Sequence, residues 1–462
     1  MRFLTILAVL LLVSPVYAAE NLTLSGSLKN ETSVRLDNMN ADLTKEKNIF
    51  ELAGEYKING DELVLFAKAK YWYDAAYDAR DKLDIAQHYA GHIQRTDWLR
   101  DLYLDYTRDN WFLRLGKQQV VWGQADGIAV LDRVNPVDLS EYWLPDLQDI
   151  RIPLWMANIN YSPKLNSNLQ VLIIPDFEQS TSAPVGAPFC TYAYIRYDNW
   201  KKAMLAAHGS VNENLYFPGK QFENSTFGLQ WSDRIGDWNY TLNYLNGFYT
   251  SARNLTISLG YPNYKVDRAF KRYRLYGGSF NKSFSNPGPM QGITLKGDVA
   301  LYNDEPTYIG DPVLGSSKRI NRWNNVFWLI GAERYFFTKY LFSVQYAQYI
   351  LEHAKEKSNY AELTSPAYRY PLNAYTYGYA DQVENIFSIK LSTQFMNDRL
   401  KPELSWSFTD DDQGKVSPKV NYEIKDNLVL TVGAHYFYGS LYDSNGQYRD
   451  QNQLYTNLKY SF

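Results

Sequence analysis

Hydrophobic and polar residues alternate along much of this chain. From Leu63 to Tyr71 the odd-numbered positions are apolar or aromatic, whereas Lys68 and Lys70 share the opposite face. Leu428 to Tyr438 show the same period of two. This pattern predicts strands with one apolar and one polar face. The apolar face would meet a core in a soluble sheet, or lipid in a membrane barrel.

The spacing of the connections decides between these two settings. Short turns such as Asn59-Gly60 and Asp109-Asn110 alternate with long segments such as 123–151 and 176–223. Outer-membrane barrels have short periplasmic turns and long extracellular loops. We therefore predict an all-β fold, a transmembrane antiparallel β-barrel of about 18 strands with both termini on the periplasmic side. The predicted strands are 22–35, 48–58, 62–74, 98–108, 111–122, 152–162, 168–175, 224–233, 238–250, 268–284, 292–308, 321–338, 340–353, 381–397, 400–410, 414–425, 428–440 and 450–462.

Both ends of the chain carry targeting signals. Arg2, an apolar run and the small-residue site ending at Ala18 predict a cleaved signal peptide at 1–18. Residues 19–462 are then a single barrel domain. The last strand alternates through Leu458, Tyr460 and the terminal Phe462, which resembles the insertion signal of bacterial outer-membrane proteins. We expect a location in the outer membrane of a Gram-negative bacterium.

Composition supports a barrel and excludes several other classes. Aromatic residues make up 16% of the chain, including 40 Tyr, and such rings settle at water–lipid interfaces. A net charge of −3 gives no electrostatic reason to bind nucleic acid. The one cysteine, Cys190, excludes an intramolecular disulfide, a cysteine zinc site and attached c-type haem. No cofactor or metal is expected. A helix is predicted at Asn199 to His208, in the longest loop.

The predicted polar faces carry charges of both signs. The turn at Asp109-Asn110 places Asp105 opposite Arg114, and the turn at Asn59-Gly60 predicts that Glu51 lies opposite Lys68 and Lys57 opposite Glu62. A lumen of mixed charge lacks the one-sided ring of a strongly ion-selective pore. The predicted lumen residues are Glu51, Lys68, Lys70, Asp101, Asp105, Arg114, Arg272, Arg274 and His435, with Glu403 and Glu423 balancing Lys415 and Lys419.

One segment has the features of an ordered internal loop. A strand ends in Trp122-Gly123, and the loop that follows contains turns fixed by Asn135-Pro136 and Leu144-Pro145. We predict that 123–151 folds into the lumen, where its charged residues pair with charges of the wall. The alternative is a surface loop held by its own caps. The residues assigned to this constriction are Lys117, Gln118, Trp122, Gly123, Asp126, Asp132, Arg133, Asn135, Pro136, Asp138 and Arg151.

The same segment resembles a family. Gly116-Lys117-Gln118, Trp122-Gly123 and Asn135-Pro136-Val137-Asp138 are similar to a pattern in a poorly characterised proteobacterial outer-membrane family of unknown function, related to alginate-export-type and porin-like barrels. Gln124 departs from it, because an acidic residue is expected there. The resemblance covers about forty residues and implies a transport-type barrel, in some members beside an inner-membrane exporter of hydrophobic compounds. It implies no substrate.

Three functions remain open. The first is an outer-membrane channel or transporter for a small or amphipathic solute. The second is a barrel scaffold around a partner, either an exporter component or a multihaem cytochrome conduit, and the third is a structural or adhesive barrel. An enzyme is not expected, because the sequence has neither an H-E-x-x-H nor a G-x-S-x-G motif. Expected partners are outer-membrane lipid and the barrel-assembly machinery, with an inner-membrane exporter or a periplasmic lipid carrier as a further candidate.

Overall fold

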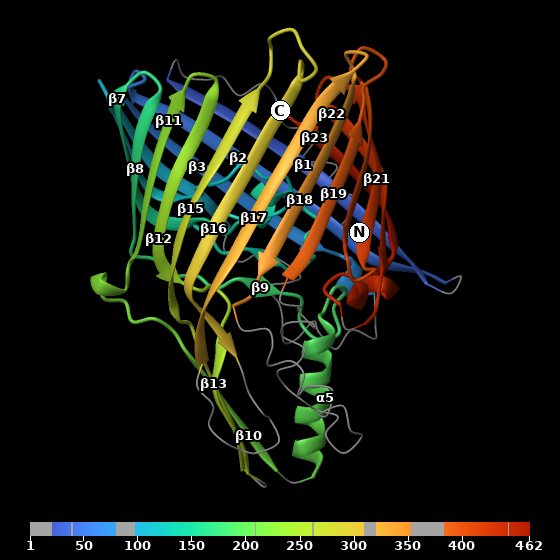
Figure 1. The fold of residues 1–462 in the computed structure, drawn as a ribbon. Helices are drawn as coiled ribbons and strands as arrows, with labels where there is room; N and C mark the ends of the chain where they lie inside the picture. Colours follow the sequence, from blue (N-terminus) through green and yellow to red (C-terminus); the bar gives the residue numbers. More distant parts are fainter. Residues whose placement is uncertain are drawn as a thin grey trace.

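The computed structural model is an 18-stranded antiparallel β-barrel (Figure 1). It describes residues 21–37, 40–79, 98–207, 209–260, 263–308, 320–352, 383–441 and 443–462, so the predicted signal peptide lies outside the described residues. The barrel strands are β1 (Leu22–Asp37), β2 (Asn40–Asn59), β3 (Leu63–Asp74), β4 (Leu99–Arg108), β5 (Trp111–Gln118), β7 (Leu154–Lys164), β8 (Ser167–Ile174), β11 (Thr226–Ile235), β12 (Trp238–Phe248), β15 (Arg272–Ser283), β16 (Ile293–Tyr308), β17 (Ile320–Phe336), β18 (Tyr340–Ile350), β19 (Val383–Ser392), β20 (Leu400–Thr409), β21 (Gly414–Lys425), β22 (Leu428–Tyr438) and β23 (Gln453–Ser461).

The first and last strands close the barrel. β1 pairs with β2 on one side and with β23 on the other. Gly26 and Phe462 exchange two backbone hydrogen bonds of 2.9 and 3.0 Å. Both ends of the described chain therefore lie at the short-turn end of the barrel. Within the described ranges, no helix has both the length and the apolar composition needed to cross a membrane.

Alternation separates the two faces of the wall as predicted. The outward side chains of Leu229, Leu242 and Ile330 are 44%, 60% and 45% exposed, which suits a surface in contact with lipid. Each predicted strand has an observed counterpart. The largest difference is at β2, which starts at Asn40 rather than at residue 48, and β19 ends at Ser392 rather than at residue 397. β5 ends at Gln118 rather than at residue 122, because the chain turns inward after it.

The strand register confirms one predicted pair and corrects the others. Asp105 lies opposite Arg114. Glu51 lies opposite Lys70 rather than Lys68, and Lys57 lies opposite Val64 rather than Glu62. The turn is longer than two residues and a bulge lies next to it between Lys57 and Asn59, so that the net shift from the predicted register is two residues. An even shift keeps every side chain on its predicted face.

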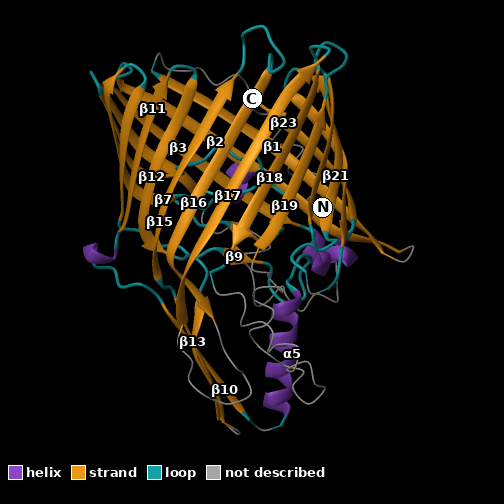
Figure 2. Cartoon of the chain, in the orientation of Figure 1, coloured by secondary structure: helices purple, strands orange, loops and turns teal. Residues whose placement is uncertain are grey.

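A helix and a small sheet project from the long-loop end. The helix α5 spans Tyr192–Ala206, so it begins seven residues before the predicted start, where Thr191 accepts a hydrogen bond from the Tyr194 backbone N–H. A separate sheet of three strands contains β10 (Ser210–Tyr216), β14 (Asn263–Ala269) and β13 (Arg253–Gly260). Both project beyond the barrel in Figure 2.

Candidate functional site: a loop inside the barrel

The segment 119–153, between β5 and β7, packs against the inner wall of the barrel. Two glycines permit its sharp turns. Gly116 has a φ of +136°, and a Cβ atom there would lie 2.2 Å from the Leu102 carbonyl oxygen. Gly123 has a φ of +97°, and its Cβ atom would lie 2.8 Å from a carboxylate oxygen of Asp298. Neither position accepts a larger residue without a shift of the backbone.

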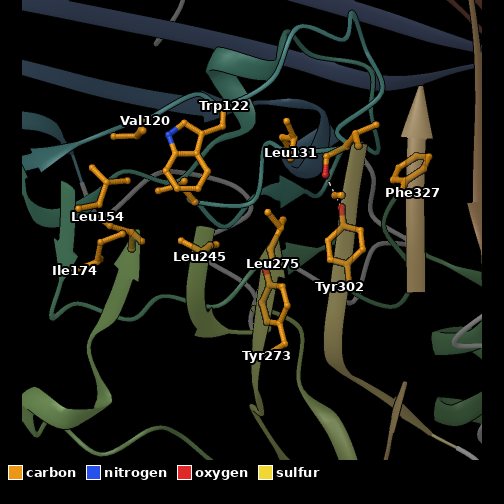
Figure 3. Packing of buried hydrophobic residues seen from close by; sticks show 14 of the residues in the cluster. Val120, Trp122, Leu131, Leu154, Ile174, Leu245, Tyr273, Leu275, Tyr302 and Phe327 are labelled. Carbon is orange, nitrogen blue, oxygen red and sulfur yellow. Dashed lines mark hydrogen bonds between the residues drawn. The ribbon is translucent and has the colours of Figure 1, made fainter. Parts of the chain in front are cut away.

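The first part of the loop packs through apolar side chains. Trp122 is 2% exposed and Leu131 is fully buried. They belong to one cluster with Ile174 of β8, Leu245 of β12 and Leu275 of β15 (Figure 3). We call this part, residues 120–134, the apolar half of the loop. Burying such side chains stabilises the loop by roughly 1.5–3 kcal/mol each.

Amide groups hold the entry to the loop. Gln118 is 1% exposed and accepts a hydrogen bond of 3.2 Å from Asn158. The Trp122 indole N–H donates to Gln170 at 2.8 Å, and Gln170 donates to Asn158 at 3.0 Å. Asn135 accepts from the Val120 backbone N–H at 2.9 Å and donates to the Ile152 carbonyl at 2.9 Å. These bonds tie the two ends of the loop together beside the fully buried Pro136.

The tip of the loop is attached to β16 and β18. The Asp298 carboxylate accepts from the backbone N–H groups of Gln124 and Ala125 at 2.9 and 3.0 Å. Lys296 forms an ion pair with Asp126 and a second one of 3.1 Å with Glu333. Lys296 and Asp298 were absent from our predicted site, although charges two residues apart on a strand point to one face.

The later part of the loop is attached by charges to the opposite side of the lumen. Glu141 forms ion pairs with Lys45 and Lys47 of β2. Asp149 lies 2.8 Å from Lys70, whose ammonium also lies 3.2 Å from Glu51. We call residues 138–151 the charged half of the loop.

The electrostatics of the charged half follow from burial and these partners. Burial would raise the pKa of Glu141, but Lys45 and Lys47 outweigh it and hold that pKa well below its usual value. Lys70 likewise outweighs burial and lowers the pKa of Asp149. Both carboxylates are therefore ionised at neutral pH.

Other charges of the loop are paired within it. Arg151 lies 2.5 Å from Asp132, and burial raises the pKa of Asp132 despite this partner. Arg133 donates to the Tyr302 hydroxyl at 3.2 Å. Asp138 accepts from Ser140 and from Thr181 of β9 (Thr181–Ser182), which pairs with β6 (Asp138–Leu139). We expected five loop charges to pair with charges of the wall: Asp126, Asp132, Arg133, Asp138 and Arg151. Within the part of the chain that the structure describes, only Asp126 forms such an ion pair.

Three predicted site residues lie on the other face of the wall. Arg272 and Arg274 alternate with Tyr273 and Leu275, which are buried against the loop, so both arginines point outward. Arg272 packs its guanidinium 4.5 Å from the Phe248 ring. Lys117 pairs with Trp155, which is 44% exposed, and it too is on the outward face. The prediction that Arg272 and Arg274 line the lumen is wrong, and Lys117, which we assigned to the constriction, lies on the outward face instead.

The inner surface consists of two different walls. On β2–β5 the inward residues form the charged wall: Glu51, Lys68, Lys70, Asp101, Asp105 and Arg114. On β7, β8, β11, β12 and β15 the inward residues nearer the short turns, beyond the apolar cluster, form the amide wall: Asn158, Asn160, Asn168, Gln170, Gln230, Ser232, Thr241, Asn243, Ser279 and Asn281. These ten side chains are all neutral, and the inward charge that follows them on β11 is Arg234, beside the turn at Gly236.

Farther around the barrel, His435 faces inward from β22. It lies 2.9 Å from the Ser417 hydroxyl and stacks on the Tyr455 ring at 4.7 Å. Glu403 lies 3.2 Å from both Lys390 and Lys419, whereas Lys415 donates to the Trp143 carbonyl of the loop. Among the described residues no group of three or more His, Cys, Asp or Glu could hold a metal ion.

Three solved structures have a similar fold. OccAB4 of Acinetobacter baumannii has a TM-score of 0.52 at 11% identity, over 97% of this chain and 100% of that chain. OpdK of Pseudomonas aeruginosa, solved with vanillate, has a TM-score of 0.52 at 8% identity, over 96% and 99%. A BenF-like porin from Pseudomonas fluorescens Pf-5 has a TM-score of 0.52 at 9% identity, over 96% and 98%. At these identities the likeness establishes the fold alone, a porin-like β-barrel.

A family model described as "Protein of unknown function (DUF1302)" matches residues 1–462. The chain therefore belongs to this family, which agrees with the family type that the loop motif suggested. No curated protein matches the chain.

Proposed function

We propose that this protein is a channel for a small or amphipathic solute across the outer membrane of a Gram-negative bacterium, with segment 119–153 as its constriction. The observation that carries the proposal is the attachment of one loop to both sides of the lumen. Asp298 and Lys296 hold its tip, and Lys45, Lys47 and Lys70 hold its charged half. A barrel of 18 strands without such a loop leaves room for an aqueous channel.

The test is single-channel conductance of the refolded mature protein in a planar bilayer. The intact protein is compared with a variant in which 123–151 is replaced by a short Gly-Ser linker. A matched control deletes α5, which lies outside the barrel. We expect a steady, salt-dependent conductance that rises severalfold in the linker variant and not in the α5 control.

An unchanged conductance after removal of 123–151 would contradict the role of the loop as a constriction. If neither the intact protein nor the linker variant conducted ions, the proposed channel function would be contradicted. An intact barrel that is silent and opens only in the linker variant would indicate a gated transporter rather than an open pore.

We further propose that the barrel-assembly machinery recognises the last strand of the barrel. Leu458 and Tyr460 are 43% and 37% exposed on the outward face, and Phe462 ends the same face. Phe462→Ala would then lower the amount of folded protein in the outer membrane, and Asn457→Ala on the inward face would not.

A further inference from the structure

The two walls offer different chemistry to a passing solute. The charged wall is largely self-neutralised. Glu51 lies 3.2 Å from both Lys68 and Lys70, and Arg114 makes two hydrogen bonds of 2.7 Å to Asp105. A charge whose partner is already in contact attracts a passing ion weakly, because the fields of the two groups largely cancel. The charged wall therefore gives little preference for an anion or a cation.

The amide wall offers neutral groups that both donate and accept. A carboxamide has an accepting oxygen and two N–H donors, and a hydroxyl group both donates and accepts. Several of these groups bond to one another, as from Asn168 to Asn160 at 3.0 Å and from Thr241 to Asn243 at 2.7 Å. The result is a continuous neutral surface across β7, β8, β11, β12 and β15.

One group of this wall is incompletely satisfied. Asn243 is 5% exposed, and among the described residues its side-chain N–H₂ has no hydrogen-bond partner. A buried donor without an acceptor costs free energy until an oxygen atom reaches it. Nearby, Asn281 donates to the loop-tip residue Gln124 at 3.1 Å, so the wall continues up to the constriction.

We infer that the amide wall is a track for neutral, hydroxyl-rich solutes of the sugar or polyol class. A solute hydroxyl exchanges hydrogen bonds with Asn, Gln, Ser and Thr side chains and requires no counter-charge. A carboxylate or an ammonium of the same size loses hydration in the constriction and finds no free charge on this wall. This inference rests on the proposed channel function and names the substrate class of that channel.

The test measures uptake of three labelled probes by proteoliposomes held at zero membrane potential. Glucose, gluconate and glucosamine share a carbon skeleton and differ in charge. We expect glucose to enter severalfold faster than either ion. Equal or faster entry of gluconate or glucosamine would overturn the inference. A salt current without any uptake of glucose would also overturn it, and the absence of both current and uptake would instead contradict the channel.

Two isosteric variants locate the effect on one wall. Gln230→Glu places a carboxylate on the amide wall. We expect this variant to take up glucose more slowly, and we expect the ratio of glucosamine uptake to gluconate uptake to rise severalfold. Asn421→Asp is the matched control on β21, where the new carboxylate still accepts from Thr431. Equal effects of the two variants would overturn the assignment to the amide wall, since a general change of lumen charge would then explain both.

Discussion

The apolar and charged halves of the loop are held in opposite ways. Trp122 and Leu131 of the apolar half are buried among side chains of β8, β12 and β15. Glu141 and Asp149 of the charged half are held by lysines of β2 and β3. Burial acts without regard to pH or salt, whereas ion pairs respond to both. One loop can therefore combine an attachment that does not depend on pH with an attachment that a change of pH or salt weakens.

The largest effect is expected from the centre of the apolar half. Trp122→Ala removes a side chain that is 2% exposed, and such truncations cost about 3–5 kcal/mol. The loop should detach from β8 and β12, so single-channel conductance should rise. The control is Trp143→Ala in the half-buried part of the charged half. A conductance change as large in the control would remove the distinction between the halves.

The next effect concerns the tip. Asp298→Asn removes the negative charge of the group that accepts hydrogen bonds from the Gln124 and Ala125 backbone N–H groups. Hydrogen bonds to charged groups contribute about 1.5–3 kcal/mol each. We expect more frequent current fluctuations in single-channel records. Asp101→Asn makes the same change on the charged wall and should leave the frequency of current fluctuations unchanged. If neither variant changed the frequency of current fluctuations, Asp298 would not be the residue that holds the tip of the loop.

Acid should release the charged half before the apolar half. The pKa values of Glu141 and Asp149 are lowered in the folded protein, so their stabilisation is complete above the usual carboxyl pKa. It is lost as pH falls below about 4 and through the lowered values. Conductance should therefore be constant from neutral pH to about 5 and rise below about 4. The double variant Glu141→Gln/Asp149→Asn should lose this step; a step that persists would assign it to other groups.

The smallest effect is expected from one pair of the charged wall. Asp105→Asn breaks a partly exposed cross-strand pair that contributes about 0.2–1 kcal/mol, so stability should change little. It leaves Arg114 without its carboxylate, and the reversal potential in a salt gradient should shift toward anions. Arg114→Gln should shift it toward cations, and the double variant should return it close to the native value. Shifts of the same sign in both single variants would contradict the pairing.

The sequence alone determined the strands and much of the closed barrel. A period of two follows from strand geometry itself, so the alternation along β3 or β22 needs no tertiary contact to be recognised. The two-residue turn at Asp109-Asn110 also determined that Asp105 faces Arg114, because a tight turn sets the register of its hairpin. The longer β2–β3 turn, with its bulge, did not carry that information, and Glu51 was assigned the wrong partner.

Only the tertiary structure decided which face of β15 is the inside. We assigned Arg272 and Arg274 to the lumen because polar faces of a water-filled barrel point inward. Here the lumen is occupied by Trp122 and Leu131, so the apolar Tyr273 and Leu275 point inward and the arginines outward. The wall residues that hold the loop could not be predicted from the sequence either. Asp298 lies 174 positions from Gln124 in the chain, and no local pattern joins residues that meet only when the barrel closes around the loop.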